Sequence, residues 1–211
     1  MLIENESSLK TQVKTVKSII KSSVSSFPFY VYFDKKQKVS DLKLLIYDED
    51  GELINEYKSK DFDDISPSSG SDLIVDGKYK YLKYVATSIP FTYEFSYSTK
   101  SSNTAFLPDW QIANGFAESV EQSIISVTVI DPSIELLVDE KLSDCSIKKD
   151  TKTNQYKASL KGLKALEYEE YSLPSADLLP SVNFGLSKFS LEGVKGEANS
   201  WEELETGIIN L

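Results

Sequence analysis

The side chains that carry most enzyme chemistry are nearly missing from this sequence. Among its 211 residues there is no histidine and no arginine, and Cys145 is the single cysteine. No Ser/His/Asp or Cys/His arrangement can therefore be built, no imidazole can bind zinc, and no guanidinium group can hold a phosphate. Cys145 follows Asp144, whose negative charge disfavours the thiolate that a nucleophilic cysteine needs. We interpret Cys145 as structural and predict that the chain is not an enzyme.

Carboxylates are the chemistry that remains. The chain has 33 acidic residues, and a glycosidase needs only two, placed about 5–10 Å apart beside a cleft. No spacing in the sequence selects such a pair. Asp48, Asp50 and Glu52 could bind calcium, but the twelve-residue loop with a terminal glutamate is missing, so we favour a plain turn. We predict no catalytic residue, no cofactor and no metal site.

Charge and hydropathy limit the partners. The net charge of −10 repels the phosphate backbone of nucleic acids and anionic membrane surfaces. No stretch approaches the ~20 apolar residues of a membrane-spanning helix. We expect no nucleic-acid partner and no membrane span.

Apolar and polar residues alternate through much of the chain, as in strands that are buried on one face. Between Pro90 and Thr99, one face consists of the aromatic residues Phe91, Tyr93, Phe95 and Tyr97. Such a row could stack on a sugar or a nucleobase. We favour packing against a second sheet, because aromatic side chains bury large areas in strands.

Turn residues between these runs predict two hairpins. The first covers residues 42–58 with Gly51 in its turn, and the second covers residues 73–85 with Asp76-Gly77 in its turn. The alternation changes phase at Tyr81-Leu82, which predicts a β-bulge there.

Roughly a dozen short strands with little helical periodicity predict an all-β fold. The specific expectation is an antiparallel two-sheet β-sandwich with a short C-terminal helix. We expect one sandwich domain over residues 1–199, with two sub-sheets as an alternative. Residues 200–211 are expected to begin a linker helix that leads to a downstream domain.

The C-terminal residues provide the first candidate site. Ser200-Trp201-Glu202-Glu203 has the pattern of a capping box, and Trp201, Leu204 and Ile208 recur at helical spacing. A large indole on an exposed helix is costly to leave in water and is typical of interface anchors. We predict that these three residues form an interface. The alternative for Trp201 is packing on its own domain.

Trp110 is the second candidate. It follows Leu107-Pro108-Asp109, a rigid turn that could present the indole for stacking on a ligand. Tryptophan is mostly buried on average, so the alternative is that Trp110 packs at one end of the hydrophobic core. The corresponding second function is a carbohydrate- or peptide-binding β-sandwich.

Several segments together resemble a known family. The resemblance is strongest at Asn103-Thr104-Ala105-Phe106-Leu107-Pro108-Asp109-Trp110-Gln111, followed by Val120-Glu121-Gln122-Ser123. The chain is similar there to the uncharacterised N-terminal region that precedes transglutaminase-like domains in exported proteins of Bacteroidetes-type bacteria. Other segments that fit the same family are residues 29–51, residues 58–64, Lys188-Phe189-Ser190 and Ser200-Trp201-Glu202-Glu203.

The resemblance implies a function that the residues alone do not. It implies a non-catalytic module that scaffolds, or positions substrate for, a downstream transglutaminase-like domain of the same polypeptide, a cysteine peptidase or acyltransferase. It also implies export to the periplasm or cell surface by a signal peptide, which the first residues of this chain do not resemble. A transglutaminase-like site needs a Cys/His/Asp triad, so only the accessory portion is implied and no active-site residue is carried over.

Overall fold

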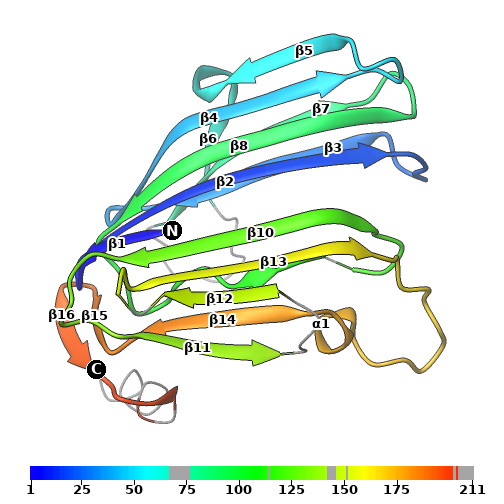
Figure 1. The fold of residues 1–211 in the computed structure, drawn as a ribbon. Coiled ribbons are helices and arrows are strands. Elements are labelled where there is room, and N and C mark those ends of the chain that lie inside the picture. Colours follow the sequence, from blue (N-terminus) through cyan, green and yellow to red (C-terminus); the bar gives the residue numbers. More distant parts are fainter. Residues whose placement is uncertain (67–76, 114, 142–145, 151, 202, 204–211) are drawn as a thin grey trace. The chain divides into compact units, whose positions relative to one another are not determined.

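The computed structural model describes residues 1–211 apart from 67–76, 114, 142–145, 151, 202 and 204–211 (Figure 1). Strands dominate the described residues, and helical structure is limited to short pieces such as α1 (Ser175–Leu178) and the 3-10 turn η1 (Ser59–Asp61). The all-β prediction is therefore confirmed. The chain folds as two compact units: unit 1 comprises residues 1–9 and 102–211, and unit 2 comprises residues 10–101.

Unit 1 contains a larger sheet, a smaller sheet and a hairpin. The larger sheet has the order β12-β13-β10-β1-β2, and its strands are β1 (Leu2–Asn5), the start of β2 (Ser8–Ile19), β10 (Val120–Val129), β12 (Ser146–Asp150) and β13 (Gln155–Leu163). The smaller sheet has the order β11-β14-β9, with β9 (Trp110–Gln111), β11 (Leu136–Lys141) and β14 (Ser181–Leu186). The hairpin consists of β15 (Lys188–Leu191) and β16 (Val194–Glu197).

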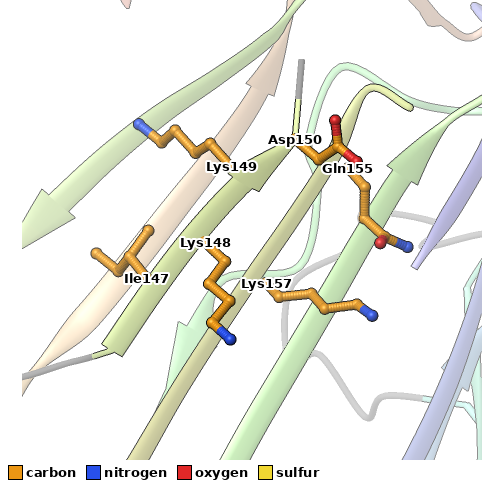
Figure 2. A pocket seen from close by; sticks show the side chains of 6 residues that line it. All are labelled: Ile147, Lys148, Lys149, Asp150, Gln155 and Lys157. Carbon is orange, nitrogen blue, oxygen red and sulfur yellow. The ribbon is translucent and has the colours of Figure 1, made fainter. Parts of the chain in front are cut away.

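Strand alternation separates a core face from an outer face in the larger sheet. On β13, Tyr156 and Ala158 are each 2% exposed, whereas Lys157 between them projects from the other face. Lys157 lies opposite Lys148 of β12, and Figure 2 shows both side chains on that outer face. The expected antiparallel pairing holds across β10, β13 and β12, while β1 and β10 pair in parallel.

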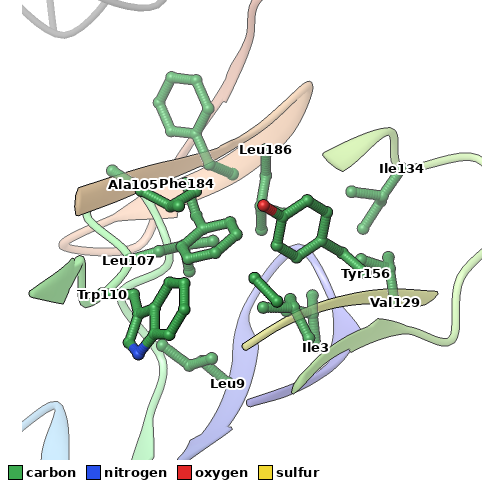
Figure 3. Close-up of a cluster of buried hydrophobic side chains, with 14 of the residues drawn as sticks. Ile3, Leu9, Ala105, Leu107, Trp110, Val129, Ile134, Tyr156, Phe184 and Leu186 are labelled. Carbon is green, nitrogen blue, oxygen red and sulfur yellow. The ribbon is translucent and has the colours of Figure 1, made fainter. Parts of the chain in front are cut away.

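The core of unit 1 lies between its two sheets. Val127 of β10 and Tyr156 of β13 contribute from the larger sheet, and Phe184 and Leu186 of β14 contribute from the smaller one. The Tyr156 and Phe184 rings meet edge to face, with centroids 5.4 Å apart, and Figure 3 shows them converging with Leu186. Inward-facing residues of both sheets therefore share one apolar cluster, as expected for sheets that are each buried on one face.

Unit 2 also contains two sheets. One has the order β2-β8-β4-β5, with the rest of β2 joined by β4 (Gln37–Tyr47), β5 (Leu53–Lys58) and β8 (Phe91–Ser101). The other has the order β3-β7-β6, with β3 (Ser26–Phe33), β6 (Asp63–Ile65) and β7 (Lys78–Val85).

The core of unit 2 is rich in aromatic rings, and it uses the aromatic row of β8. Phe91 is 1% exposed, and the other three members of the row are half-buried against the same cluster. Rings from the two sheets meet edge to face: Phe29 of β3 lies 4.9 Å from Tyr93 of β8, measured between ring centroids. The interpretation of this row as a packed sheet face is confirmed, because its rings are occupied by aromatic neighbours.

The predicted hairpin at residues 42–58 is present as β4 and β5. Gly51 has φ 83°, which favours glycine, and its N–H donates to the Asp48 carbonyl at 3.2 Å. The Asp48 side chain is used by the turn itself, since its Oδ1 accepts from the Asp50 and Glu52 amides at 3.0 and 2.9 Å. This geometry is that of a plain turn, which we favoured over calcium binding.

The prediction for residues 73–85 is partly outside the described residues, because 67–76 are not described. The returning strand is β7, and it pairs with β3 and β6. The bulge predicted at Tyr81-Leu82 is wrong: β7 pairs with β3 in unbroken register from Lys78 to Val85. The phase change arises because aromatic residues occupy both faces of β7.

The prediction of a single two-sheet sandwich is not confirmed. The buried residues of the described chain fall into two clusters, one in each unit, rather than into the single core that one sandwich would have. Alternation shows that one face of a strand is buried, but it does not show which other sheet covers that face. The predicted C-terminal helix lies mostly outside the described residues, since 202 and 204–211 are not described.

Asp150, at the end of β12, provides a pH-dependent test of unit 1. Hydrogen bonds from the Thr153 hydroxyl and from the Lys152 and Thr153 backbone amides hold the pKa of Asp150 below its usual value. Because the folded pKa is lower than the unfolded value of ~3.9, the carboxylate stabilises the fold above that pH, and this contribution is lost as the pH falls through the folded pKa.

We therefore expect Asp150→Asn to lower the free energy of unfolding more at pH 7 than at pH 3. Urea unfolding at the two pH values measures the difference. An equal effect at both would contradict the role of the charge.

Candidate functional site

The hairpin of β15 and β16 carries the chain toward the candidate interface residues. Its two-residue turn consists of Glu192 with φ 52° and Gly193 with φ 92°, as a type I′ turn requires. Phe189 of β15 is 1% exposed and its ring covers Gly196 of β16. A Cβ at Gly196 would lie 2.5 Å from two carbons of that ring, so the close approach requires glycine.

The segment at Asn103 and Thr104 holds this hairpin. Thr104 is 0% exposed; its Oγ1 accepts from the Ser190 amide at 2.9 Å and donates to the Glu6 carbonyl, while its own amide donates to the Ser190 carbonyl at 2.8 Å. Asn103 and Glu192 exchange two more hydrogen bonds, of 2.8 and 2.5 Å. We call this arrangement the Thr104 clamp. It satisfies backbone groups that would be costly to bury unpaired.

Hydrogen bonds continue past the hairpin to Glu203. The Ala198 amide donates to the Ser187 carbonyl at 2.9 Å. The Ser200 hydroxyl accepts from the Glu203 amide at 3.2 Å, which is one half of the predicted capping box. The Glu203 carboxylate accepts from the backbone and side-chain nitrogens of Asn199, at 2.8 and 3.1 Å, one residue before the position expected for the other half.

Trp201 is half-buried and packs against the core cluster of unit 1. Its indole Nε1 is fully buried and has no hydrogen-bond acceptor within the described part of the chain. Buried N–H groups are nearly always paired, which makes Trp201 a candidate for a further contact. The other two predicted interface residues, Leu204 and Ile208, lie outside the described residues.

Trp110 lies in the core of unit 1. It is 6% exposed, it begins β9 opposite Val182 of β14, and its Nε1 donates to the Ser123 hydroxyl at 2.9 Å. Figure 3 shows the indole beside Leu107 and Leu9. Trp110 therefore packs in the core, which was the alternative to stacking on a ligand. Little of its ring surface is left for a ligand.

The exposure of Phe106 was not predicted from the sequence. Its side chain is 64% exposed, between the buried residues Ala105 and Leu107. The alternation of buried and exposed residues that is typical of strands continues through this loop, and it could have predicted that Phe106 points outward. Nearby, burial raises the pKa of Asp109, although much of this residue is exposed. Phe106 and Asp109 both lie on the loop that follows Thr104, and both side chains are largely exposed.

Four of the segments that carry the family resemblance come together in unit 1, whereas residues 29–51 and 58–64 belong to unit 2. Thr104 bonds to Ser190, and Trp110 bonds to Ser123, so the first motif joins the segments at 120–123 and 188–190. Trp201, from the last motif, packs on the same cluster. In the described residues, these side chains hold the segment that contains Trp201, and none of them forms a reactive pair.

The remaining candidates for a binding or metal site have little support in the described residues. A shallow depression beside β12 and β13 is lined by Ile147, Lys148, Lys149, Asp150, Gln155 and Lys157 (Figure 2). Among the described residues, no group of three or more Cys, Asp or Glu side chains is placed to hold a metal ion. In that part of the chain, none of the helices has the length and hydrophobicity of a membrane span. Cys145 lies outside the described residues.

These observations define a class of protein: a β-rich domain whose recognisable motifs stabilise its own fold and its C-terminal segment. Residues 11–167 match the family DUF3857, a domain of unknown function with a solved structure. Because the match covers more than half of the chain, the chain belongs to this family. The recognition of an uncharacterised domain from the sequence is thus confirmed.

One solved structure extends the comparison. The chain is similar to the crystal structure of a protein from Parabacteroides distasonis named as a "putative protease", with a TM-score of 0.63 and 13% sequence identity. The similarity covers 87% of this chain and 38% of that chain, so this chain spans well under half of the length of its structural relative. At this identity the likeness shows a shared fold alone. A comparison with curated proteins gives no match.

Proposed function

We propose that this chain is a non-catalytic accessory module of a transglutaminase-like protein, a cysteine peptidase or acyltransferase. In this role it scaffolds the catalytic domain or positions its substrate. The proposal depends on two properties of the chain. It has no histidine among its 211 residues, and the family motifs at Thr104, Ser190 and Trp201 hold a C-terminal segment on unit 1. The protein of similar fold is longer than this chain and is named as a protease, which supports an accessory place for the shared domain.

The environment of Trp201 supports the proposal of an interface near the C-terminal segment. Its indole packs partly on unit 1, and its buried N–H lacks an acceptor among the described residues. An acceptor supplied by the adjoining part of the polypeptide would satisfy it, and tryptophan is a frequent anchor of interfaces. We propose that Trp201, Leu204 and Ile208 contact the catalytic domain. The Thr104 clamp then fixes the direction in which the chain approaches that domain.

The family resemblance supports export, and we propose a periplasmic or cell-surface location for the whole protein. Its partner in this proposal is the transglutaminase-like domain of the same polypeptide.

The reading frame after Leu211 and the purified chain together test the proposal. We expect Cys, His and Asp at transglutaminase-like spacing in the polypeptide that follows. We also expect no turnover by the 211-residue chain in amine-incorporation and peptidase assays. A stop codon directly after Leu211, or turnover that a single substitution in this chain abolishes, would contradict the accessory role.

The interface is tested by expressing this chain and the following polypeptide as separate proteins and measuring their affinity by calorimetry. We expect Trp201→Ala to weaken binding by roughly tenfold or more, as at hot-spot positions. Because Trp201 also packs on unit 1, Ile208→Lys is a second variant, expected to weaken binding, and the thermal midpoint of each variant is measured to separate loss of binding from loss of folding. Phe106→Ala is a matched control that removes an exposed ring elsewhere in unit 1. Equal affinity of all variants would refute the interface.

A further inference from the structure

The outer face of the sheet β3-β7-β6 in unit 2 carries four tyrosines. Tyr30 and Tyr32 of β3 lie opposite Tyr81 and Tyr79 of β7. Directly opposed residues on neighbouring strands project from the same face. The residues that alternate with them on β3 are buried in the core of unit 2, so the tyrosines occupy the side away from that core.

These rings are more exposed than is usual for a cluster of aromatic side chains. Tyr30 is 60% exposed and Tyr32 is 38% exposed, while Tyr79 and Tyr81 are half-buried. The other aromatic residues of unit 2 mostly pack in its core cluster. Exposed aromatic side chains that cluster on one face, rather than occurring singly, mark a candidate recognition site.

The tyrosine rings are held in place before any ligand binds. Tyr79 packs edge to face with both neighbours, with centroids 5.9 Å from Tyr30 and 5.5 Å from Tyr32. The Tyr32 hydroxyl donates to Asp34 at 3.0 Å, and Asp34 is fixed by the amides of Lys36 and Gln37 at 2.7 and 2.6 Å. A ligand that stacks here therefore loses little affinity to ordering of side chains.

Polar groups border the rings on the same face. Asp63 of β6 lies opposite Tyr81, and Lys83 follows two residues after Tyr81 on β7. A carboxylate accepts hydrogen bonds and an ammonium group donates them. Sugar hydroxyls both donate and accept, so they fit this pair. A proline-rich peptide offers mainly carbonyl acceptors, which Lys83 and the tyrosine hydroxyls match but the carboxylate of Asp63 does not.

The size of the surface favours a small ligand over a protein. An aromatic side chain buries about 150–250 Å² when covered, so the exposed parts of Tyr30 and Tyr32 together offer roughly 200 Å². A stable protein interface needs about 800 Å² on each partner. The net charge of −10 disfavours an anionic ligand.

We propose that the four tyrosines, together with Asp63 and Lys83, form a binding platform for a neutral glycan made of hexopyranose rings. The apolar face of a sugar ring stacks on the tyrosines, and its hydroxyls bond to Asp63 and Lys83. This inference is independent of the accessory role proposed above, since it uses unit 2 and needs no catalytic domain.

Native gel electrophoresis of the 211-residue chain in gels containing soluble polysaccharides tests the platform. The probes are hydroxyethylcellulose, laminarin, galactomannan and glycogen, which differ in linkage and are uncharged. We expect at least one to retard the chain. Calorimetry with a hexasaccharide of the same linkage should then show roughly tenfold weaker binding for Tyr30→Ala, given that one tenfold step corresponds to about 1.4 kcal/mol.

Controls separate stacking from general effects. Tyr171→Ala removes a tyrosine that is 95% exposed in unit 1, and it should leave the retardation unchanged. Asp63→Asn should weaken binding several-fold while the thermal midpoint stays constant, which keeps the test valid if Tyr30→Ala unfolds. Ile208→Lys, the variant of the proposed interface, should bind the glycan normally.

Three results would overturn the platform. The first is the failure of all four polysaccharides to retard the chain. The second is displacement of the bound hexasaccharide by a decaproline peptide at lower concentration than by the sugar itself, which would indicate a peptide site. The third is self-association of the chain that Tyr30→Ala abolishes, which would indicate that a second copy covers this face.

Discussion

Phe91→Ala is expected to lower the free energy of unfolding by about 3–5 kcal/mol, the usual cost of removing a buried aromatic ring from a core. The Phe91 ring is 1% exposed. It packs edge to face against Phe27 and Tyr84, with centroids 5.0 and 5.4 Å away. Its loss would remove contacts between the two sheets of unit 2, because Phe91 begins β8 while Phe27 and Tyr84 belong to β3 and β7 of the other sheet.

Urea unfolding followed by circular dichroism measures this effect. Phe106→Ala is the matched control, since it deletes the same ring at a position that is 64% exposed. We expect the control to change the free energy of unfolding by no more than about 0.5 kcal/mol. Similar losses for the two variants would show that the packing of Phe91 does not stabilise the fold as described.

Thr104→Val is expected to lower the free energy of unfolding by about 1–3 kcal/mol, because it leaves buried polar groups without a partner. Valine has nearly the shape of threonine but cannot accept from the Ser190 amide or donate to the Glu6 carbonyl. Since Thr104 is 0% exposed, water cannot replace these bonds without rearrangement. The hairpin that leads to Trp201 should therefore loosen.

A fluorescence measurement detects the loosening directly. The chain has two tryptophans, so a Trp110→Phe background leaves Trp201 as the only indole. In that background we expect Thr104→Val to make Trp201 more accessible to quenching by acrylamide. Thr104→Ser retains the hydroxyl and should restore most of the protection. If serine behaves like valine, the hydroxyl of Thr104 is not what holds the hairpin.

The alternation of apolar and polar residues and the turn residues between them were sufficient to predict many of the strands. The aromatic row of β8 was identified with its buried face, because period-two alternation directly encodes which residues share a side of a strand. The turn at Gly51 was equally clear, since few residues other than glycine adopt its φ of 83°. The same local logic failed at Tyr81-Leu82, where aromatic residues on two faces imitated a change of phase.

The candidate sites were less predictable because they depend on long-range contacts. Thr104 and Ser190 are 86 positions apart in the chain, and only the fold brings the hydroxyl to the amide. The four-tyrosine face was not predicted, because pairing β3 with β7 joins two tyrosines from each strand that are about fifty residues apart. The burial of Trp110 likewise follows from its pairing with β14.

The amino-acid sequence by itself determined that this protein is built from strands, that it cannot form histidine-dependent catalytic sites, and that it resembles an uncharacterised family. These properties are set by residue type and by spacing over a few positions. Only the tertiary structure decided that the strands divide into two units with separate cores, that Trp110 is buried, and that Thr104 holds the segment of Trp201. The physical reason is that burial and hydrogen-bond satisfaction depend on which distant strands pair, and that choice is made by the whole chain.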